Sequence, residues 1–311
     1  MEQQTPRLHL LAPAKINLSL KILGKREDGY HELESLMQKI TLYDELELSL
    51  TTEPGVRIHC LNAVLPDDTN NIAVRAAQLF LKETSNQSQG VSIVLKKNIP
   101  IAAGLGGGSS DAAAVLNGLN QLLKTTYSPK QLAELGVQIG ADVPLFIYDF
   151  PAALATGIGE CLIPAPSLSG FQVLLVNPGI LVSTKWAYEA FSTAAEKITL
   201  TAEQKAFTLP CSKKSRQKNI LKGASTSEFI IPDDLLNDLE QVTVKRYPVI
   251  QDIKNRLLAS GAAGAMMSGS GSTVFGLFHR EAEKKAEQCR CLLQQKYDLV
   301  YLVPPLSKKE V

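Results

Sequence analysis

The sequence is poor in several features that would point to particular classes of protein. Its five cysteines are an odd number and lack the spacing of a disulfide framework or a zinc site, so we expect reduced thiols. The formal net charge is only +1, which predicts no polyanionic partner and therefore no nucleic acid.

Long apolar runs that could cross a membrane are also missing. Residues 161–184 carry no charge but are interrupted by three prolines and two glycines, and residues 257–278 contain five glycines and four serines. A membrane-spanning helix needs about 20 predominantly apolar residues. The first residues include Glu2 and Arg7 and no apolar stretch, so we expect no secretory signal and a cytoplasmic location.

The chain mixes strand and helix patterns over a length that suits two domains, because its 311 residues exceed what one compact core usually uses. Apolar residues alternate in residues 15–23, 45–50 and 91–95, which predicts strands. Spacings of three and four predict helices after Asn71 and after the glycines at 104–108. Because strands and helices do not alternate strictly, we predict an α+β fold.

The second half continues this mixture beyond a stretch rich in proline and serine at residues 164–170, where we place the domain boundary. The two domains are then residues 1–164 and 165–311. The polar segment 196–227 is more often a solvated excursion than a functional basic patch. The elements expected are a strand at 171–176, a helix from Thr184, helices near 235–247 and 248–260, strands at 263–267 and 273–278, a helix at 280–296 and a strand at 299–303.

A run of glycine and serine stands between a predicted strand and a predicted helix. Its glycines leave the backbone open to a phosphate group, and a helix N-terminus adds partial positive charge. A Walker A loop needs a lysine here, and Ser109 stands where a dinucleotide fingerprint needs glycine, which disfavours a nicotinamide-dependent dehydrogenase. A flexible linker would not lead directly into an apolar-striped helix. The predicted phosphate loop consists of Gly104, Leu105, Gly106, Gly107, Gly108, Ser109 and Ser110.

Three other features are ambiguous by themselves. Transfer of a phosphoryl group to an alcohol needs one carboxylate and one cation, and Asp142 and Lys15 are candidates. An aspartate just past a helix end is most often a turn residue, and a strand lysine is usually solvated. The glycine-serine run at residues 267–272 suits a hairpin turn as well as a ligand loop.

Taken together, these motifs resemble the superfamily of galactokinase, homoserine kinase, mevalonate kinase and phosphomevalonate kinase, the GHMP kinases. Residues 13–18, 100–113 and 267–276 are similar to its three motifs in order and spacing. The resemblance implies an N-terminal ATP-binding and catalytic domain, a C-terminal α/β sandwich domain on the substrate side, and ATP as co-substrate with Mg²⁺ whose ligands stay unassigned. Residues 28–33 and 140–144 resemble the branch that phosphorylates a cytidylated polyol for isoprenoid synthesis.

This resemblance implies a role for each matching residue. Asp142 matches the catalytic base, Lys15 the cation beside it, and residues 104–110 the nucleotide phosphate loop. The implied partner is a small cytidylated polyol, with no nucleic acid and no membrane, for a chain that is a monomer or weak homodimer. The matched substrate-binding positions are Asn17, Tyr30, His31, Thr184 and Tyr188, the last being a ring that stacks on cytosine.

Two other functions stay open. The first is a superfamily kinase for another alcohol, such as homoserine or mevalonate, although the Tyr30–His31 pair suits a nucleobase better. The second is a non-catalytic ligand sensor built on the same fold. A sensor could lose Asp142 or Lys15, and both are present in this sequence.

Overall fold

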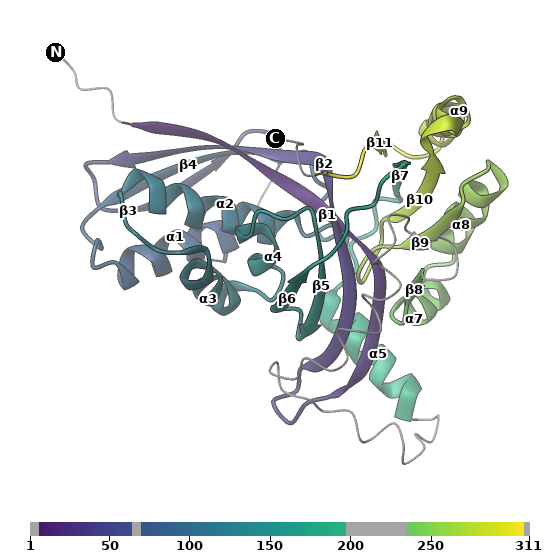
Figure 1. Ribbon diagram of the computed structural model, residues 1–311, viewed down its shortest axis with the longest axis horizontal. Coiled ribbons are helices and arrows are strands. Elements are labelled where there is room, and N and C mark those ends of the chain that lie inside the picture. Colours follow the sequence, from purple (N-terminus) through teal and green to yellow (C-terminus); the bar gives the residue numbers. More distant parts are fainter. Residues whose placement is uncertain (1–5, 64–69, 197–234, 308–311) are drawn as a thin grey trace. The chain divides into compact units, whose positions relative to one another are not determined.

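A computed structural model describes residues 6–63, 70–196 and 235–307 of the chain, as two compact units that are interleaved in sequence (Figure 1). Strands β1 (Arg7–Lys25) and β2 (His31–Thr51) contribute to both units. The domain division at residue 164 stays a prediction. The first unit draws its described residues from Met1–Ala14, Leu42–Ile99 and Gly106–Asp149, and the second from Lys15–Thr41, Pro100–Leu105 and Phe150–Val311.

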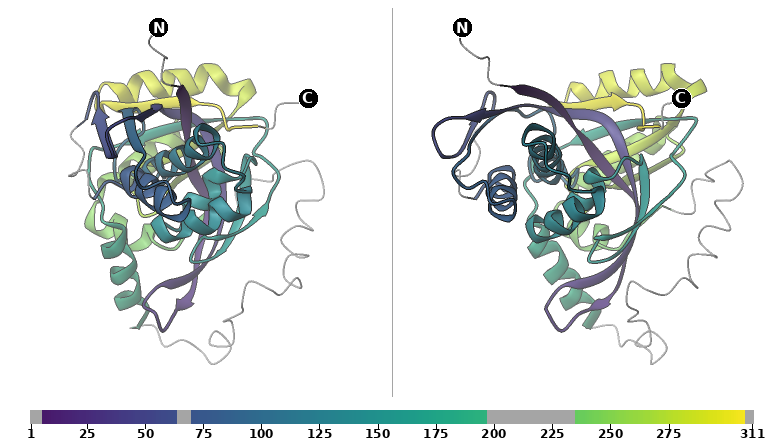
Figure 2. Two further views of the ribbon diagram at one scale, coloured as in Figure 1. Left: turned by 90° about the vertical axis from the view of Figure 1, so that its left-hand side faces the viewer. Right: turned by 60° about the vertical axis from the view of Figure 1, so that its left-hand side comes forward.

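In the first unit, strands form a surface on which helices pack. Strand β4 (Gly90–Lys96) pairs in parallel with β3 (Gly55–Cys60) and antiparallel with the last part of β2. Figure 2 shows α1 and α2 along one side of these strands. Phe80 of α1 and Leu116 of α2 are completely buried. The helices of this unit are α1 (Ile72–Glu83), α2 (Gly107–Leu122), α3 (Pro129–Ile139) and α4 (Val143–Ile147).

These helices begin and end at residues whose chemistry predicts it. The side chain of Asn71 accepts a hydrogen bond from the backbone at the start of α1. Ser128 and Gln131 form a capping box before α3, and Gly140 follows its last residue. Such caps supply partners for backbone groups that a helix end leaves unpaired. The predicted start of α1 after Asn71 is therefore confirmed, whereas α2 begins at Gly107, inside the glycine run that was expected to precede it.

The second unit contains two sheets. In one, the strand order is β8-β1-β2-β5-β6, with β8 parallel to β1 and β5 antiparallel to the first part of β2. The other has the antiparallel order β11-β7-β10-β9. These strands are β5 (Ala152–Gly157), β6 (Cys161–Pro164), β7 (Phe171–Asn177), β8 (Leu236–Asn237), β9 (Gly264–Met267), β10 (Val274–His279) and β11 (Leu299–Val303).

Helices α8 and α9 pack against the β11-β7-β10-β9 sheet around a core that includes Val176, Ile253 and Phe278. Every element expected between residues 171 and 303 is present, and the α+β class is confirmed. The helix expected at 280–296 begins with a 3-10 turn. The helices of this unit are α5 (Thr184–Glu196), α7 (Glu240–Arg246), α8 (Val249–Ala259), η2 (Arg280–Ala282) and α9 (Glu283–Gln294).

Two expectations need correction. The polar face of the strand at 15–23 is not solvated, because both faces of β1 are buried from Ala14 to Leu18, including Lys15 at 4% exposure. Cys60, Cys289 and Cys291 are free thiols, but Cys161 is disulfide-bonded, so the expectation of reduced thiols is wrong there. Nearly all of the polar segment 196–227 lies outside the described residues. No helix within the described ranges is long and apolar enough to cross a membrane.

The burial of Phe80 generates a test of the first unit's core. Phe80→Ala should lower the free energy of unfolding by about 3–5 kcal/mol, because it removes a ring that is 0% exposed and leaves a cavity. Gln78→Ala, at an exposed position of the same helix, should change that free energy by less than about 0.5 kcal/mol. Denaturant unfolding measures both, and equal effects would contradict this placement of Phe80.

Candidate functional site

The candidate residues fall into two groups, one in each unit. The predicted phosphate loop is divided between them, because Leu105 belongs to the second unit and Gly106 to the first. The first unit holds Gly106, Gly107, Gly108, Ser109, Ser110 and Asp142. The second unit holds Lys15, Asn17, Tyr30, His31, Gly104, Leu105, Thr184 and Tyr188.

The loop has the backbone of an anion site at the start of α2. Gly106 is the N-cap of this helix and has a φ of 71°, in the left-handed region that favours glycine. The Ser110 N–H donates to Gly106 O at 2.9 Å and makes the first helical bond, so the preceding N–H groups point out of the helix end. Ser110 Oγ is buried and has no hydrogen-bond partner among the described residues. This geometry suits a phosphate group.

The glycines of the loop are needed for packing as well as for phosphate access. A Cβ atom on Gly107 would lie 2.9 Å from Ile99 Cγ2, and one on Gly108 would lie 3.1 Å from Ile72 Cδ1. Both vectors therefore point into the first unit. These two glycines therefore allow close contact between the start of α2 and the core, and their contact with phosphate stays a prediction.

In the second unit, Ser268 joins two of the sequence motifs. Its hydroxyl donates to Gly104 O at 2.9 Å and accepts from Asn17 N at 3.3 Å. Gly104 has a φ of 77°, and a Cβ atom there would overlap Ser268 O. The run at residues 267–272 therefore does more than connect β9 to β10, because it holds the start of the phosphate loop.

Asn237 supports this run from the other side, and the sequence analysis missed it. Its Nδ2 donates to Met267 O and to Gly269 O, each at 2.8 Å, while Oδ1 accepts from Leu239 N. Glu240 accepts from Met267 N at 2.8 Å. The available signal was the polar pair Asn237–Asp238 between Leu236 and Leu239.

Lys15 and Asn17 lie on the same face of β1, as their spacing of two predicts. Lys15 Nζ donates to Asn17 Oδ1 at 2.6 Å, and Asn17 Nδ2 donates to Ser35 Oγ at 2.8 Å. The Lys15 backbone N–H donates to Leu105 O, the residue directly before Gly106. Asn17 thus orients the lysine, and the lysine's own backbone is fastened to the phosphate loop.

His31 and Tyr188 form a stacked pair of rings, with centroids 5.1 Å apart and planes inclined by 28°. His31 Nε2 is hydrogen-bonded to Ser192 Oγ at 2.6 Å. Burial, and secondly the charge of Lys25, lower the pKa of His31, so its ring is neutral near pH 7. The structure therefore brings two of the predicted cytosine-binding residues together.

Two other substrate candidates, Tyr30 and Thr184, lie outside this ring pair. Tyr30 is 60% exposed, in a turn where its N–H donates to Asp28 Oδ1. Thr184 Oγ1 lies 3.1 Å from Ser270 Oγ, which connects the start of α5 to the run at residues 267–272. Contact of these residues, and of Asn17, with a substrate stays a prediction.

Asp142 stands at the N-cap position of α4, but its side chain makes no capping hydrogen bond to that helix. Its segment packs near the phosphate loop, because a Cβ atom on Gly140 would lie 3.8 Å from Ser109 Oγ. Helix α4 also packs against α2. This arrangement fits a carboxylate with a role beyond ending a turn.

Models of one protein family match two stretches of this chain. The model for the N-terminal domain of GHMP kinases covers residues 71–150, and the model for their C-terminal domain covers residues 216–294. The 4-diphosphocytidyl-2-C-methyl-D-erythritol kinase of Desulfotalea psychrophila is 46% identical over 96% of this chain and 94% of its own length. The chain belongs to the 4-diphosphocytidyl-2-C-methyl-D-erythritol kinase family.

Two more members of this kinase family agree. The protein of that name from Syntrophotalea carbinolica is 48% identical over 86% of this chain and 88% of its own length. A crystal structure of 4-(cytidine 5'-diphospho)-2C-methyl-D-erythritol kinase matches with a TM-score of 0.71 at 34% identity, covering 95% of this chain and 98% of that one. The resemblance seen in the motifs and the GHMP kinase fold are thereby confirmed.

For a kinase of this family, the left-handed backbone at Gly106 predicts a specific defect. Gly106→Ala should raise the KM for ATP by on the order of tenfold, because an alanine at a φ of 71° strains the backbone that receives phosphate.

Gly170→Ala is the matched control. Gly170 has a φ of 75° with nothing within 4 Å of an added Cβ, so the same strain arises away from the loop. Steady-state kinetics should show an unchanged KM for ATP in that variant. Equal KM values for ATP in the two alanine variants would contradict the assignment of Gly106 to the nucleotide site.

Proposed function

We propose that this chain transfers the γ-phosphoryl group of ATP to a hydroxyl of 4-diphosphocytidyl-2-C-methyl-D-erythritol, a step in the non-mevalonate synthesis of isoprenoid precursors. The observation that carries the proposal is the 46% identity, over 96% of the chain, to a kinase named for that substrate. The geometry supports it with an anion-binding helix start at Gly106 and a neutral ring pair suited to a nucleobase.

The chemical step needs a proton acceptor and a cation. The acceptor hydroxyl attacks the γ-phosphorus, the bond to the β–γ bridging oxygen breaks, and ADP leaves. We assign the hydroxyl proton to the carboxylate of Asp142, and the balancing of developing negative charge to Lys15. The hydrogen bond from Lys15 to Asn17 supports this assignment, because it fixes the direction of a buried ammonium group.

Magnesium fits this proposal as a companion of the nucleotide. The described residues contain no group of three or more histidine, cysteine, aspartate or glutamate side chains that could hold a metal ion. Mg²⁺ is commonly held by one or two protein ligands together with substrate phosphates, where it neutralises their charge. We therefore expect it to arrive with ATP. The cytoplasmic location and the monomeric or weakly dimeric state also stay predictions.

Cytosine recognition is assigned to Tyr30, His31 and Tyr188. Cytosine presents a flat face that an aromatic ring can stack on, and an edge with one amino donor and two acceptors. Stacking on an aromatic side chain contributes about 1–3 kcal/mol per base. The lowered pKa of His31 supports the assignment, because a neutral imidazole whose Nε2 is hydrogen-bonded to Ser192 Oγ still has its other ring nitrogen to address that edge.

The base assignment is tested by Asp142→Asn, which keeps the shape of the side chain and removes its proton acceptor. We expect kcat to fall by about 10²–10⁴, with little change in ATP affinity. Asp149→Asn, at an exposed position in the same unit, is the control and should leave kcat unchanged. A near-normal kcat for Asp142→Asn would make this residue a structural turn residue.

The substrate assignment is tested by Tyr188→Ala and His31→Ala, which should each raise the KM for the cytidylated substrate at least tenfold while the KM for ATP stays constant. Glu189→Ala, the exposed neighbour on α5, serves as control. CMP and CDP should compete with the polyol substrate, and the uncytidylated polyol should not be phosphorylated. If Tyr188→Ala raised the KM for ATP and the KM for the cytidylated substrate equally, or if the uncytidylated polyol were phosphorylated, the assignment of cytosine recognition to these residues would be wrong.

A further inference from the structure

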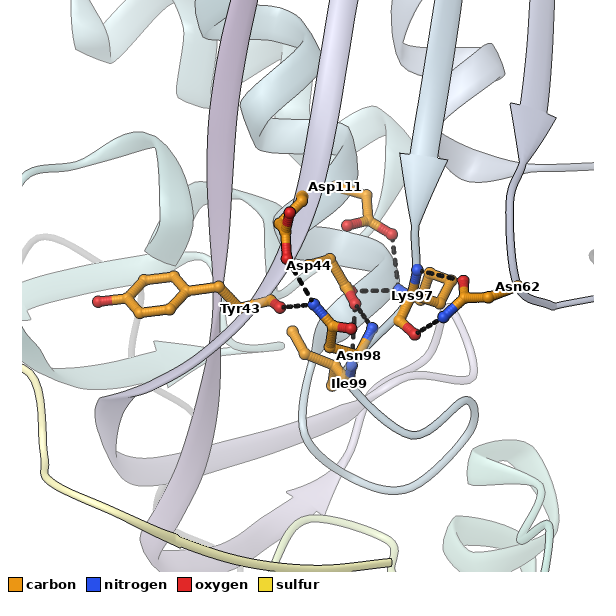
Figure 3. Close-up of polar contacts among 8 residues, drawn as sticks. Tyr43, Asp44, Asn62, Lys97, Asn98, Ile99 and Asp111 are labelled. Atoms are coloured by element: carbon orange, nitrogen blue, oxygen red, sulfur yellow. Dashed lines mark hydrogen bonds and ion pairs between the residues drawn. The ribbon is translucent and has the colours of Figure 1, made fainter.

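A buried cluster of three charged side chains, shown in Figure 3, lies in the first unit next to Gly107 at the start of α2. Lys97 Nζ donates to Asp111 Oδ2 at 2.8 Å and also contacts Asp44 Oδ2. The side chains of Asp44, Lys97 and Asp111 are 0%, 7% and 4% exposed. We call these three residues the Lys97 cluster. Burying charges is costly, and a cluster of this kind is by itself weak support for stability.

The Lys97 cluster connects three elements at the base of the loop. Asp44 lies in β2, Lys97 directly follows β4, and Asp111 lies in α2 immediately after Ser110. Figure 3 shows the Asp44 carboxylate facing the segment that follows Lys97, where Asp44 Oδ1 accepts from Asn98 N at 2.6 Å and Ile99 N at 2.9 Å.

The same segment meets the loop itself. Ile99 and Asp44 both approach Gly107, because a Cβ atom there would lie 2.9 Å from Ile99 Cγ2 and 3.3 Å from Asp44 Oδ2. The backbone of Lys97 is fixed in addition by Asn62, whose side chain pairs with its N–H and its C=O at 2.8 Å each. The first residue of α2 therefore rests directly on the cluster.

The charges of the cluster do not cancel if all three groups ionise, since two carboxylates then face one ammonium. The pKa of Asp111 is raised to about 7, first by burial and then by the nearby Asp44 carboxylate, against the attraction of Lys97. Asp44 has two backbone donors, whereas Asp111 Oδ1 is buried and has no partner within the described ranges. Of the two carboxyl groups, Asp111 is therefore the one that takes up a proton more readily, and near pH 7 it is charged only in part.

Lys97 stays charged at neutral pH. Burial alone would lower its pKa, but the charges of Asp111 and Asp44 outweigh burial and raise it. Without the ammonium, one or two carboxylates would be left uncompensated behind a helix start that must attract phosphate.

We propose that Lys97 is a positioning residue for nucleotide binding, which ties Asp44 and Asp111 together and cancels their negative charge beneath the phosphate loop. The proposal rests on the proposed function in requiring that the loop binds ATP. This role can be distinguished from a purely structural one. An electrostatic contribution to binding affinity increases with the number of phosphate charges on the ligand, whereas a structural contribution does not.

The test is direct binding of ATP, ADP and adenosine to folded protein, alongside thermal unfolding. Lys97→Met should weaken the binding of ATP about tenfold or more, weaken the binding of ADP less, and leave the binding of adenosine almost unchanged. Lys97→Arg, which keeps the charge, should stay within a few-fold of wild type. Lys96→Met is the matched control, because it removes the same charge at a position that is 46% exposed and forms a surface ion pair with Glu45, so ATP binding should be unchanged.

Two further variants keep the proposal falsifiable if Lys97→Met does not fold. Lys97→Met with Asp44→Asn should regain part of the ATP affinity, because it removes the carboxylate that keeps its charge, and adding Asp111→Asn should regain most of it, because no charge is then left in the cluster. Equal weakening of ATP and adenosine by Lys97→Met would overturn the proposal, as would a folded, uncharged triple variant that fails to bind ATP.

Failure of the proposed function is distinguishable from failure of this inference. If the wild-type protein binds ATP with this dependence on Lys97 but does not phosphorylate the cytidylated polyol, only the proposed substrate is wrong. If wild type binds no ATP, the role of Lys97 is overturned as well.

Discussion

The start of α2 must offer unpaired backbone N–H groups on one side while the other side packs against a closed core. Glycine at 107 and 108 satisfies the second requirement, since Ile99 and Ile72 leave no room for a side chain. The left-handed N-cap at Gly106 satisfies the first, because it turns the entering chain away from the helix end. Both the capped helix α1 and the short helix α4 pack against α2 in the first unit.

The second unit solves a related problem with hydroxyl and amide groups. Ser268 contacts the backbone of Gly104 and of Asn17, and its own segment is held by the amide of Asn237. A buried amide with both donors in use removes alternative conformations of a glycine-rich segment that would otherwise be mobile. The order of a flexible sequence therefore depends on residues outside the recognised motifs.

Local signals in the sequence predicted the elements well, because caps and periodicity act over a few residues. The starts of α1 and α3 follow from Asn71 and Ser128, and the order of elements after residue 171 follows from periodicity. Burial of Lys15 was not predictable, since its part of β1 is hydrogen-bonded to Leu105 and Ser268, which are distant in the sequence. The same reason hid Asn237 and the Lys97 cluster, whose partners lie in distant strands and helices.

A net charge of +1 is compatible with a ligand that carries several phosphate groups, because phosphate binding does not require lysine side chains. In the proposed function the loop instead binds phosphate through backbone N–H groups and a helix end, which add partial positive charge without a basic residue. Lys97 forms ion pairs with two buried carboxyl groups, and burial lowers the pKa of His31 so that its ring is neutral. Overall charge therefore predicts no nucleic-acid partner, but it reveals nothing about a site built from backbone dipoles and rings.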